Sequence, residues 1–246
     1  TESDSIIFRN FNDSTKWRGF TLENALDETE FRYVRISGAE KDDGGGMYLY
    51  KSNSTLTHVT ISDNTAYDGG GMRLSNSNPI LTHVIISDNT AGTSGGGMRL
   101  VSSSNPTLTH VTIKGNTAVY GGGMRLSNSN PILTNVTIAN NTANNGGGGM
   151  YLNFANPIMT NSIIWDNSPQ SIYTSSGTPL ITYSDIEAGN TWTGEGNINS
   201  NPLFTDPDAG DYALQEGSPC IDTGDPFIWY SDRSHSKKRN LYLSWR

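Results

Sequence analysis

The sequence predicts an all-β fold, a single-stranded right-handed parallel β-helix (a solenoid) with coils of about 26 residues. Three landmarks recur with this period and stay in phase, namely a methionine after a glycine run, an asparagine and a valine. No stretch shows the 3.6-residue apolar period that a helix requires. The landmarks are Met47, Met72, Met98, Met124 and Met150; Asn64, Asn89, Asn116, Asn141 and Asn167; and Val34, Val59, Val84, Val111 and Val136.

Each unit begins with a short strand that follows the glycines. In the second complete unit, Met72 and Leu74 are two residues apart and are expected to point inward, so Arg73 between them points outward. Residues 75–79, rich in Ser and Asn and closed by Pro79, then form a turn.

A second apolar stretch completes the unit. Residues 80–86 read as one strand with Val84 and Ile86 inward. Such a unit buries its strands only when parallel copies stack on it, about 4.8 Å apart. The stacked asparagines are then expected to hydrogen-bond to one another and to turn backbone, while the glycines allow positive φ or close approach at a corner.

The repeats divide the chain into four segments. We expect an N-terminal cap over residues 1–30, β-helix repeats over 31–190 and a C-terminal capping segment over 191–226, because a solenoid must cover its open strand edges. Residues 227–246 form an atypical tail with five of the chain's 16 Lys and Arg residues. This tail has two interpretations, a basic extension that meets an acidic partner or an artefactual (or disordered) sequence.

Composition narrows the classes of partner. The formal charge of −8 argues against nucleic acid as a partner of the whole surface. No apolar run is long enough to span a membrane. The single cysteine, Cys220, cannot form an intrachain disulfide and leaves the compartment open. The chain starts at Thr1 and is expected to be a mature or trimmed piece of a precursor.

The repeat resembles that of bacterial polymorphic outer-membrane and autotransporter-like surface proteins. The resemblance rests on Asn-Thr-Ala followed by Gly-Gly-Gly-Met, with Ile61 at the place of an aromatic three residues before Asn64. The C-terminal part is similar to the end of anchored bacterial β-helix proteins, in residues 161–167, 181–186, 196–199, 201–204 and 217–224. The resemblance implies a β-helix that is secreted or displayed at a cell surface. It leaves function open, because this fold hosts lyases, hydrolases, adhesins and passive stalks.

One outward column carries the main candidate site. It consists of Tyr48, Arg73, Arg99, Arg125 and Tyr151, each directly after the repeated methionine. Three guanidinium groups about 5 Å apart repel one another, whereas carboxylate or sulfate groups of a linear polymer would pair with them and sugar rings would stack on the tyrosines. The alternative is that the arginines lie over the strands and pair with Asp68 or solvent.

Two other columns carry weaker indications. Asp63 and Asp88 are neighbouring turn residues that could hold Ca²⁺, although Asp is common in turns for local reasons. His58, His83 and His110 form a stack that is a poor geometry for a metal and favours a plain surface column. We therefore expect no cofactor and no resident metal.

The regular coils favour a non-catalytic role. They repeat one surface without the single distinct acid–base cluster that catalysis requires. We expect a secreted or cell-surface module that acts in adhesion, in carbohydrate binding or as a structural spacer. The alternative is a pectate-lyase-like polysaccharide lyase, or a glycoside hydrolase, acting on acidic polysaccharide.

Overall fold

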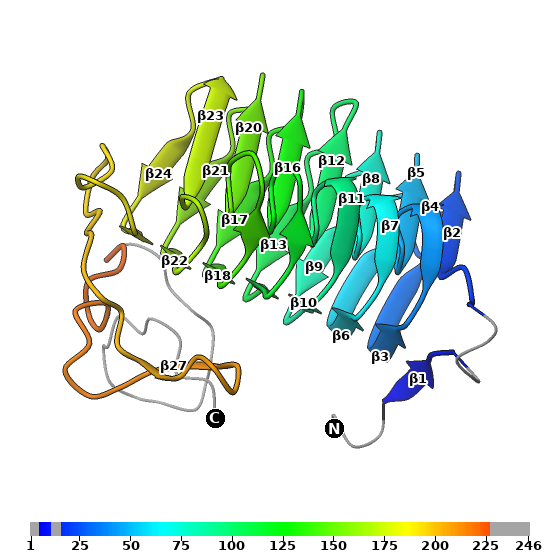
Figure 1. Cartoon of the computed structure of the whole chain (residues 1–246), viewed down its shortest axis with the longest axis horizontal. Coiled ribbons are helices and arrows are strands. Elements are labelled where there is room, and N and C mark those ends of the chain that lie inside the picture. The colour runs from blue at the N-terminus through cyan, green and yellow to red at the C-terminus, as the bar shows by residue number, and fades with distance from the viewer. Residues whose placement is uncertain (1–4, 11–15, 227–246) are drawn as a thin grey trace.

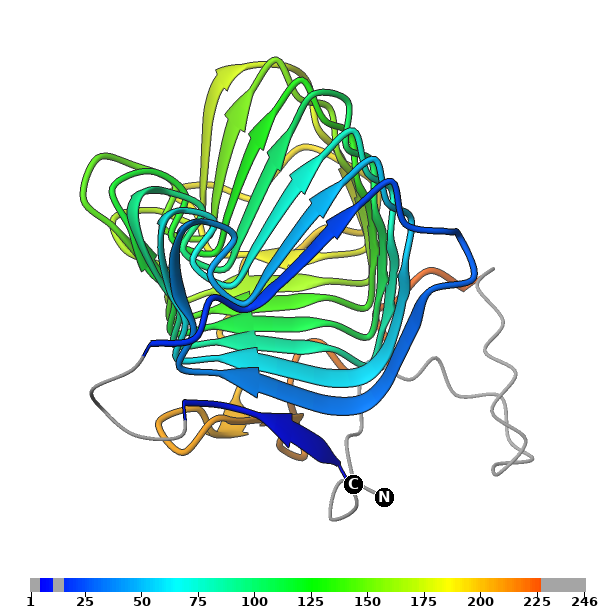
Figure 2. The ribbon, with the colours of Figure 1, turned by 90° about the vertical axis from the view of Figure 1, so that its right-hand side faces the viewer.

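The computed structural model describes residues 5–10 and 16–226, and it forms a right-handed parallel β-helix whose regular elements are all strands. Figure 1 shows the coils stacked along the long axis, and Figure 2 shows the same stack viewed along that axis. The predicted fold class is confirmed. Equivalent strands of successive coils pair in parallel. Each coil therefore adds one rung to each of three continuous sheets.

The first sheet contains the repeated methionines and is called the methionine sheet. It begins at residue 20 and takes one strand from each coil. Its strands are β2 (Phe20–Glu23), β5 (Met47–Tyr50), β8 (Met72–Ser75), β12 (Met98–Val101), β16 (Met124–Ser127), β20 (Met150–Asn153) and β23 (Ile172–Ser176).

The largest sheet, called the bent sheet, consists of two columns that meet at its long strands. The long strands are β3 (Glu30–Ser37) and β6 (Thr55–Ser62), with β1 (Ile6–Phe8) paired to β3. One column is β9 (Ile80–Thr82), β13 (Thr107–Thr109), β17 (Ile132–Thr134), β21 (Ile158–Thr160) and β24 (Leu180–Thr182). The other is β10 (Ile85–Ser87), β14 (Thr112–Lys114), β18 (Thr137–Ala139), β22 (Ile163–Trp165) and β25 (Asp185–Ile186).

The third sheet, called the short sheet, lies between the bent sheet and the methionine sheet in each coil. Its strands are β4 (Glu40–Asp43), β7 (Thr65–Asp68), β11 (Thr90–Ser94), β15 (Thr117–Ala118) and β19 (Thr142–Ala143). An antiparallel pair, β26 (Phe204–Asp206) and β27 (Asp211–Leu214), follows the coils.

The core is one column of apolar side chains inside the coils. Met72, Leu74, Val84 and Ile86 are fully buried, as predicted. The predicted single strand over 80–86 is wrong in one respect, because it divides into β9 and β10 at His83. His83 has a φ of 53°, a left-handed conformation that bends the chain. The bend allows Leu81 and Val84, three residues apart, both to point inward.

The residues at this bend form a stacked surface column. Tyr33, His58, His83 and His110 all have positive φ, and their adjacent ring centroids are 4.9 Å apart. Asn135 follows on the next rung, and its Nδ2 lies 3.1 Å from Nε2 of His110. Burial, and then the charge of His83, lowers the pKa of His110 to about 4.

Glycines form the corner between the short sheet and the methionine sheet. Gly95 has a φ of 67°, and a Cβ on Gly96 would lie 2.5 Å from the carbonyl oxygen of Gly122 on the next rung. A side chain therefore does not fit between the stacked corners. Both predicted roles of the glycines, positive φ and close approach, are confirmed.

The asparagine column is a buried hydrogen-bond ladder, as predicted. Nδ2 of Asn89 donates to Oδ1 of Asn116 and to the carbonyl oxygen of Ile61, each at 3.0 Å. The backbone N–H of Asn89 donates to the same Oδ1 at 3.0 Å. A second ladder, in which backbone N–H groups donate to side-chain hydroxyls of the next rung, runs through the buried serines Ser52, Ser77, Ser104 and Ser129.

The two ends of the solenoid are covered differently. Trp17, Phe20 and Leu22 pack against the core at the N-terminal end, and Trp192 packs against it at the other end. The segment after Trp192 then folds back along the bent sheet (Figure 1). Its residues Phe204, Tyr212 and Cys220 form a second apolar cluster with Ala139 and Ile163. The expected atypical tail, residues 227–246, lies outside the described residues.

Replacing Asn116 with Ala should lower the free energy of unfolding by about 3 kcal/mol, because the change removes the Asn116 partner of buried groups of Asn89 and Ile86 and one of the two hydrogen bonds to Oδ1 of Asn141. Chemical denaturation measures the change. Asn105→Ala is the matched control, since Asn105 accepts its hydrogen bond from Asn130 at an exposed position where water can replace it. Equal losses in the two variants would contradict the structural role of the buried ladder.

His110 should titrate near pH 4 in the folded protein. The unfolded state takes up this proton near pH 6.5, so the unfolded state binds more protons between these values and stability should fall as the pH drops from 6.5 to 4. His110→Asn, which copies the next rung at Asn135, should reduce this slope. NMR titration of the imidazole and denaturation at several pH values are the measurements. A His110 pKa near 6.5 would contradict the burial of the ring.

Candidate functional site

The predicted column of tyrosine and arginine forms a straight strip on the outer face of the methionine sheet. Tyr48 pairs in register with Arg73, followed on successive rungs by Arg99, Arg125 and Tyr151. The parallel pairing adds a rung at each end, Thr21 and Tyr173. We call the seven residues from Thr21 to Tyr173 in this register the strip. Rungs of a parallel sheet are about 4.8 Å apart, so the three guanidinium groups are neighbours.

The strip lies in the angle between the methionine sheet and the ends of the short-sheet strands. Arg73 reaches Asp43 at the end of β4 and Asp68 at the end of β7, and Arg125 reaches the hydroxyl of Ser94 at the end of β11. Figure 2 shows this angle, with the methionine sheet rising on one side and the ends and loops of the short sheet on the other. Groups from two sheets therefore meet at the strip.

Among the three arginines of the strip, Arg73 is the one with ion pairs in the described contacts. Its Nη1 contacts Oδ1 of Asp43, and it lies 3.7 Å from Oδ2 of Asp68. The column itself contains no acid, as the sequence predicts, but these carboxylates approach it from the neighbouring sheet. At this rung the structure matches the alternative interpretation, in which an arginine pairs with Asp68.

Arg99 and Arg125 have neutral partners instead. Nη1 of Arg99 donates to the carbonyl oxygen of Leu100 at 3.0 Å and to the hydroxyl of Ser127 at 3.1 Å. Burial, followed by the charge of Arg125, lowers the pKa of Arg99 to about 10, which the charge of Asp68 opposes. The strip therefore holds partly desolvated positive charges that a bound anion would stabilise.

Tyrosines flank the arginines. The guanidinium carbon of Arg125 lies 5.1 Å from the ring centre of Tyr120 and 5.2 Å from that of Tyr151. Tyr151 stacks on Tyr173 with ring centres 4.8 Å apart, and at the other end Arg73 lies 5.7 Å from the ring of Tyr48. These contacts orient the guanidinium groups and place aromatic rings along the same line.

The arginines are not arranged for stability alone. The Nε atoms of Arg73, Arg99 and Arg125 are buried, and none has a hydrogen-bond partner among the described residues. An unpaired buried N–H is unfavourable, and three like charges on adjacent rungs repel one another. A guanidinium group remains protonated at ordinary pH, so it serves as a fixed anion-binding group and not as a general base.

The two weak metal candidates are turn residues. Asp63 and Asp88 have φ values of 56° and 58°, a conformation that Asp adopts more readily than most residues. Within residues 5–10 and 16–226 there is no group of three or more His, Cys, Asp or Glu side chains positioned to hold a metal ion.

Several residues of the site were not found from the sequence. Tyr173 extends the strip, but its register is hard to see in the sequence because the last coil is shorter. The pair Ile172-Tyr173 repeats the pattern of Met150-Tyr151, and this repeat could have identified it. Asp43 and Ser94 end strands of the short sheet, and Tyr120 lies just beyond β15 of that sheet. The period of the repeat gives no information about which columns of two sheets face each other.

Comparisons with known proteins agree with this architecture. Residues 10–186, more than half of the chain, match the family described as a right-handed beta helix region. Comparisons with curated proteins and with solved structures gave no match. The described residues include no helix that is long and apolar enough to cross a membrane. The chain belongs to the right-handed β-helix family.

Proposed function

We propose that this chain is a non-catalytic β-helix module that binds acidic polysaccharide along the strip. The observation that carries the proposal is the line of Arg73, Arg99 and Arg125 on successive rungs, flanked by tyrosines. Each rung advances the strip by about 4.8 Å, a step comparable to the length of one pyranose unit. Carboxylate or sulfate groups on successive sugars would thus meet successive guanidinium groups.

Charge supports the same ligand class. The protein as a whole carries a formal charge of −8, whereas Arg99 and Arg125 are held by neutral groups in contacts with Leu100, Ser127 and Ser94. A local positive line on an acidic protein attracts a flexible polyanion only at short range, because salt screens longer-range forces beyond about 10 Å. Binding should accordingly weaken as salt is added.

The biological setting follows from the resemblance of the repeats. The chain is proposed to be bacterial, secreted or displayed at a cell surface, where polysaccharides are the abundant acidic polymers. Adhesion to such a polymer is the role that the strip supports. A plain spacer is the outcome if the strip binds no polyanion.

The double variant Arg99→Ser/Arg125→Ser should lose most of its affinity for a uronate polymer. Two charge-assisted contacts contribute about 3 kcal/mol together, which corresponds to a loss of roughly a hundredfold. Isothermal titration calorimetry with polygalacturonate at low salt measures the change. Stability should change by no more than about 1 kcal/mol, since neither arginine has an acidic partner in the described contacts.

Arg32→Ser is the matched control, because it removes one positive charge from an exposed side chain on β3 of the bent sheet. The control should bind like the parent. If the parent binds neither polygalacturonate nor a sulfated glycan at low ionic strength, the binding proposal is wrong and the spacer role remains. Equal loss in control and double variant would show that net charge, not the strip, drives binding.

The polymer should be recovered intact after incubation. The strip provides fixed positive charges without a distinct acid–base pair, so neither elimination nor hydrolysis is expected. The assays are the absorbance of unsaturated uronate and the chain length of polygalacturonate, with and without Ca²⁺. An increase in absorbance would favour the lyase alternative, and shorter chains without it would favour a hydrolase.

A further inference from the structure

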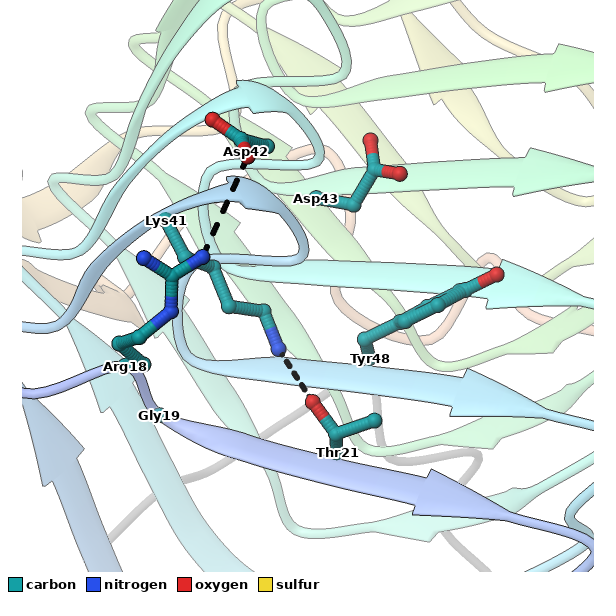
Figure 3. Close-up of a pocket in the computed structure, with 7 residues that line it drawn as sticks. All are labelled: Arg18, Gly19, Thr21, Lys41, Asp42, Asp43 and Tyr48. Carbon is teal, nitrogen blue, oxygen red and sulfur yellow. Dashed lines mark hydrogen bonds and ion pairs between the residues drawn. The ribbon is translucent and has the colours of Figure 1, made fainter.

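A cavity of about 330 Å³ lies at the N-terminal end of the strip. Its walls come from the segment before β2, from β2, from the end of β4 and from β5, and Figure 3 shows how their side chains surround it. A volume of this size is at the lower end of the range for small-molecule sites. The lining residues are Arg18, Gly19, Thr21, Lys41, Asp42, Asp43 and Tyr48.

Lys41 is the central charge of this cavity. Its Nζ donates to the hydroxyl of Thr21 at 2.8 Å and to the carbonyl oxygen of Phe20 at 3.2 Å, and it lies 5.8 Å from the ring centre of Tyr48. An ammonium group has three protons, so two are used in these bonds. The bonds aim the side chain from the short sheet across to the methionine sheet, toward the line of the strip (Figure 3).

Each of the two carboxylates of the cavity lies within ion-pair distance of an arginine. Asp43 pairs with Arg73. Oδ2 of Asp42, whose side chain is fully exposed, lies 4.0 Å from Nη2 of Arg18. Neither carboxylate forms an ion pair with Lys41 among the described contacts. Lys41 therefore remains the positive charge of the cavity without a matching acid, next to a tyrosine ring that continues the strip.

We infer that this cavity is an end subsite that binds one uronate unit of the polysaccharide, with the sugar carboxylate on Lys41 and the sugar ring against Tyr48. The inference rests on the proposed function, since it extends the strip by one specific position. The strip offers repeated guanidinium groups, whereas this shallow cavity offers a single ammonium group beside one tyrosine ring, which suits one carboxylated sugar.

The subsite has a proton linkage that the arginines lack. Burial, and then the charge of Arg18, lowers the pKa of Lys41 to about 8, and the charge of Asp43 opposes this shift. The other charged or titratable groups lining the cavity are Asp42 and Tyr48. A bound carboxylate favours the charged amine and raises its pKa. The affinity for the uronate polymer is therefore highest well below pH 8, where Lys41 is charged. It falls as the pH rises through this value, by up to about tenfold between pH 7 and pH 9.

The test compares the parent with Lys41→Met and Lys41→Arg in titrations of polygalacturonate at pH 7 and pH 9. The parent should lose affinity between the two pH values. Lys41→Met should bind at pH 7 as weakly as the parent does at pH 9, without further pH dependence. Lys41→Arg should keep the affinity at pH 7 and also lose the pH dependence, because arginine does not titrate in this range. Thermal melting of each variant checks its folding.

The outcomes separate the subsite from the strip. If Lys41→Met and the parent bind equally, with the same pH dependence, while Arg99→Ser/Arg125→Ser still loses most of its affinity, the end subsite is wrong and the strip stands. If the parent binds a sulfated glycan but not polygalacturonate at pH 7, the end subsite is wrong and the strip stands; if it binds neither polymer, both are wrong. If both Lys41 variants lose affinity at pH 7 and both melt at a lower temperature than the parent, Lys41 is a structural residue and the inference is overturned.

Discussion

The in-register stacking of each coil on the next is the constraint on which the rest of this structure depends. Parallel backbone hydrogen bonds place most strand residues above their counterparts in the neighbouring coil. Inside the coil this alignment produces the asparagine ladder, in which one amide satisfies the backbone and the side chain of its neighbour. At the corner it requires glycine, because a Cβ on Gly96 would meet the carbonyl oxygen of Gly122.

Stacking also forces like residues together on the outside, where it is not always favourable. In the imidazole stack, burial and then the charge of His83 lower the pKa of His110 to about 4, so this ring is neutral near pH 7. Stacked guanidinium groups cannot lose their protons in the same way. Arg73 is compensated by two carboxylates of the short sheet, whereas Arg99 and Arg125 have hydroxyl, carbonyl and aromatic partners. The positive charges of Arg99 and Arg125 thus lack acidic partners in the described contacts, and this distinguishes the strip from the other columns.

The ends of the solenoid show how the same stacking is stopped. A regular coil would leave a strand edge open to further pairing. Trp17 and Phe20 cover the core at one end, and Trp192 covers it at the other. The segment that follows returns along the bent sheet and packs Tyr212 and Phe204 over Ile163. This return uses the face of the solenoid that bears the bent sheet, so the strip on the methionine sheet remains free of it.

The sequence by itself determined the period, the fold class, the inward positions such as Met72 and Leu74, and the line of the three arginines. These all follow from repetition, because the residues one period apart must stack once the coils are parallel. Only the tertiary structure decided what faces that line. Asp43, Ser94 and Lys41 reach the strip across the angle between two sheets, and this angle depends on the glycine corner. The bend at His83 was likewise missed, because the outward Ile80 and Ile85 make the stretch apolar on both faces and mask the three-residue step between the inward Leu81 and Val84.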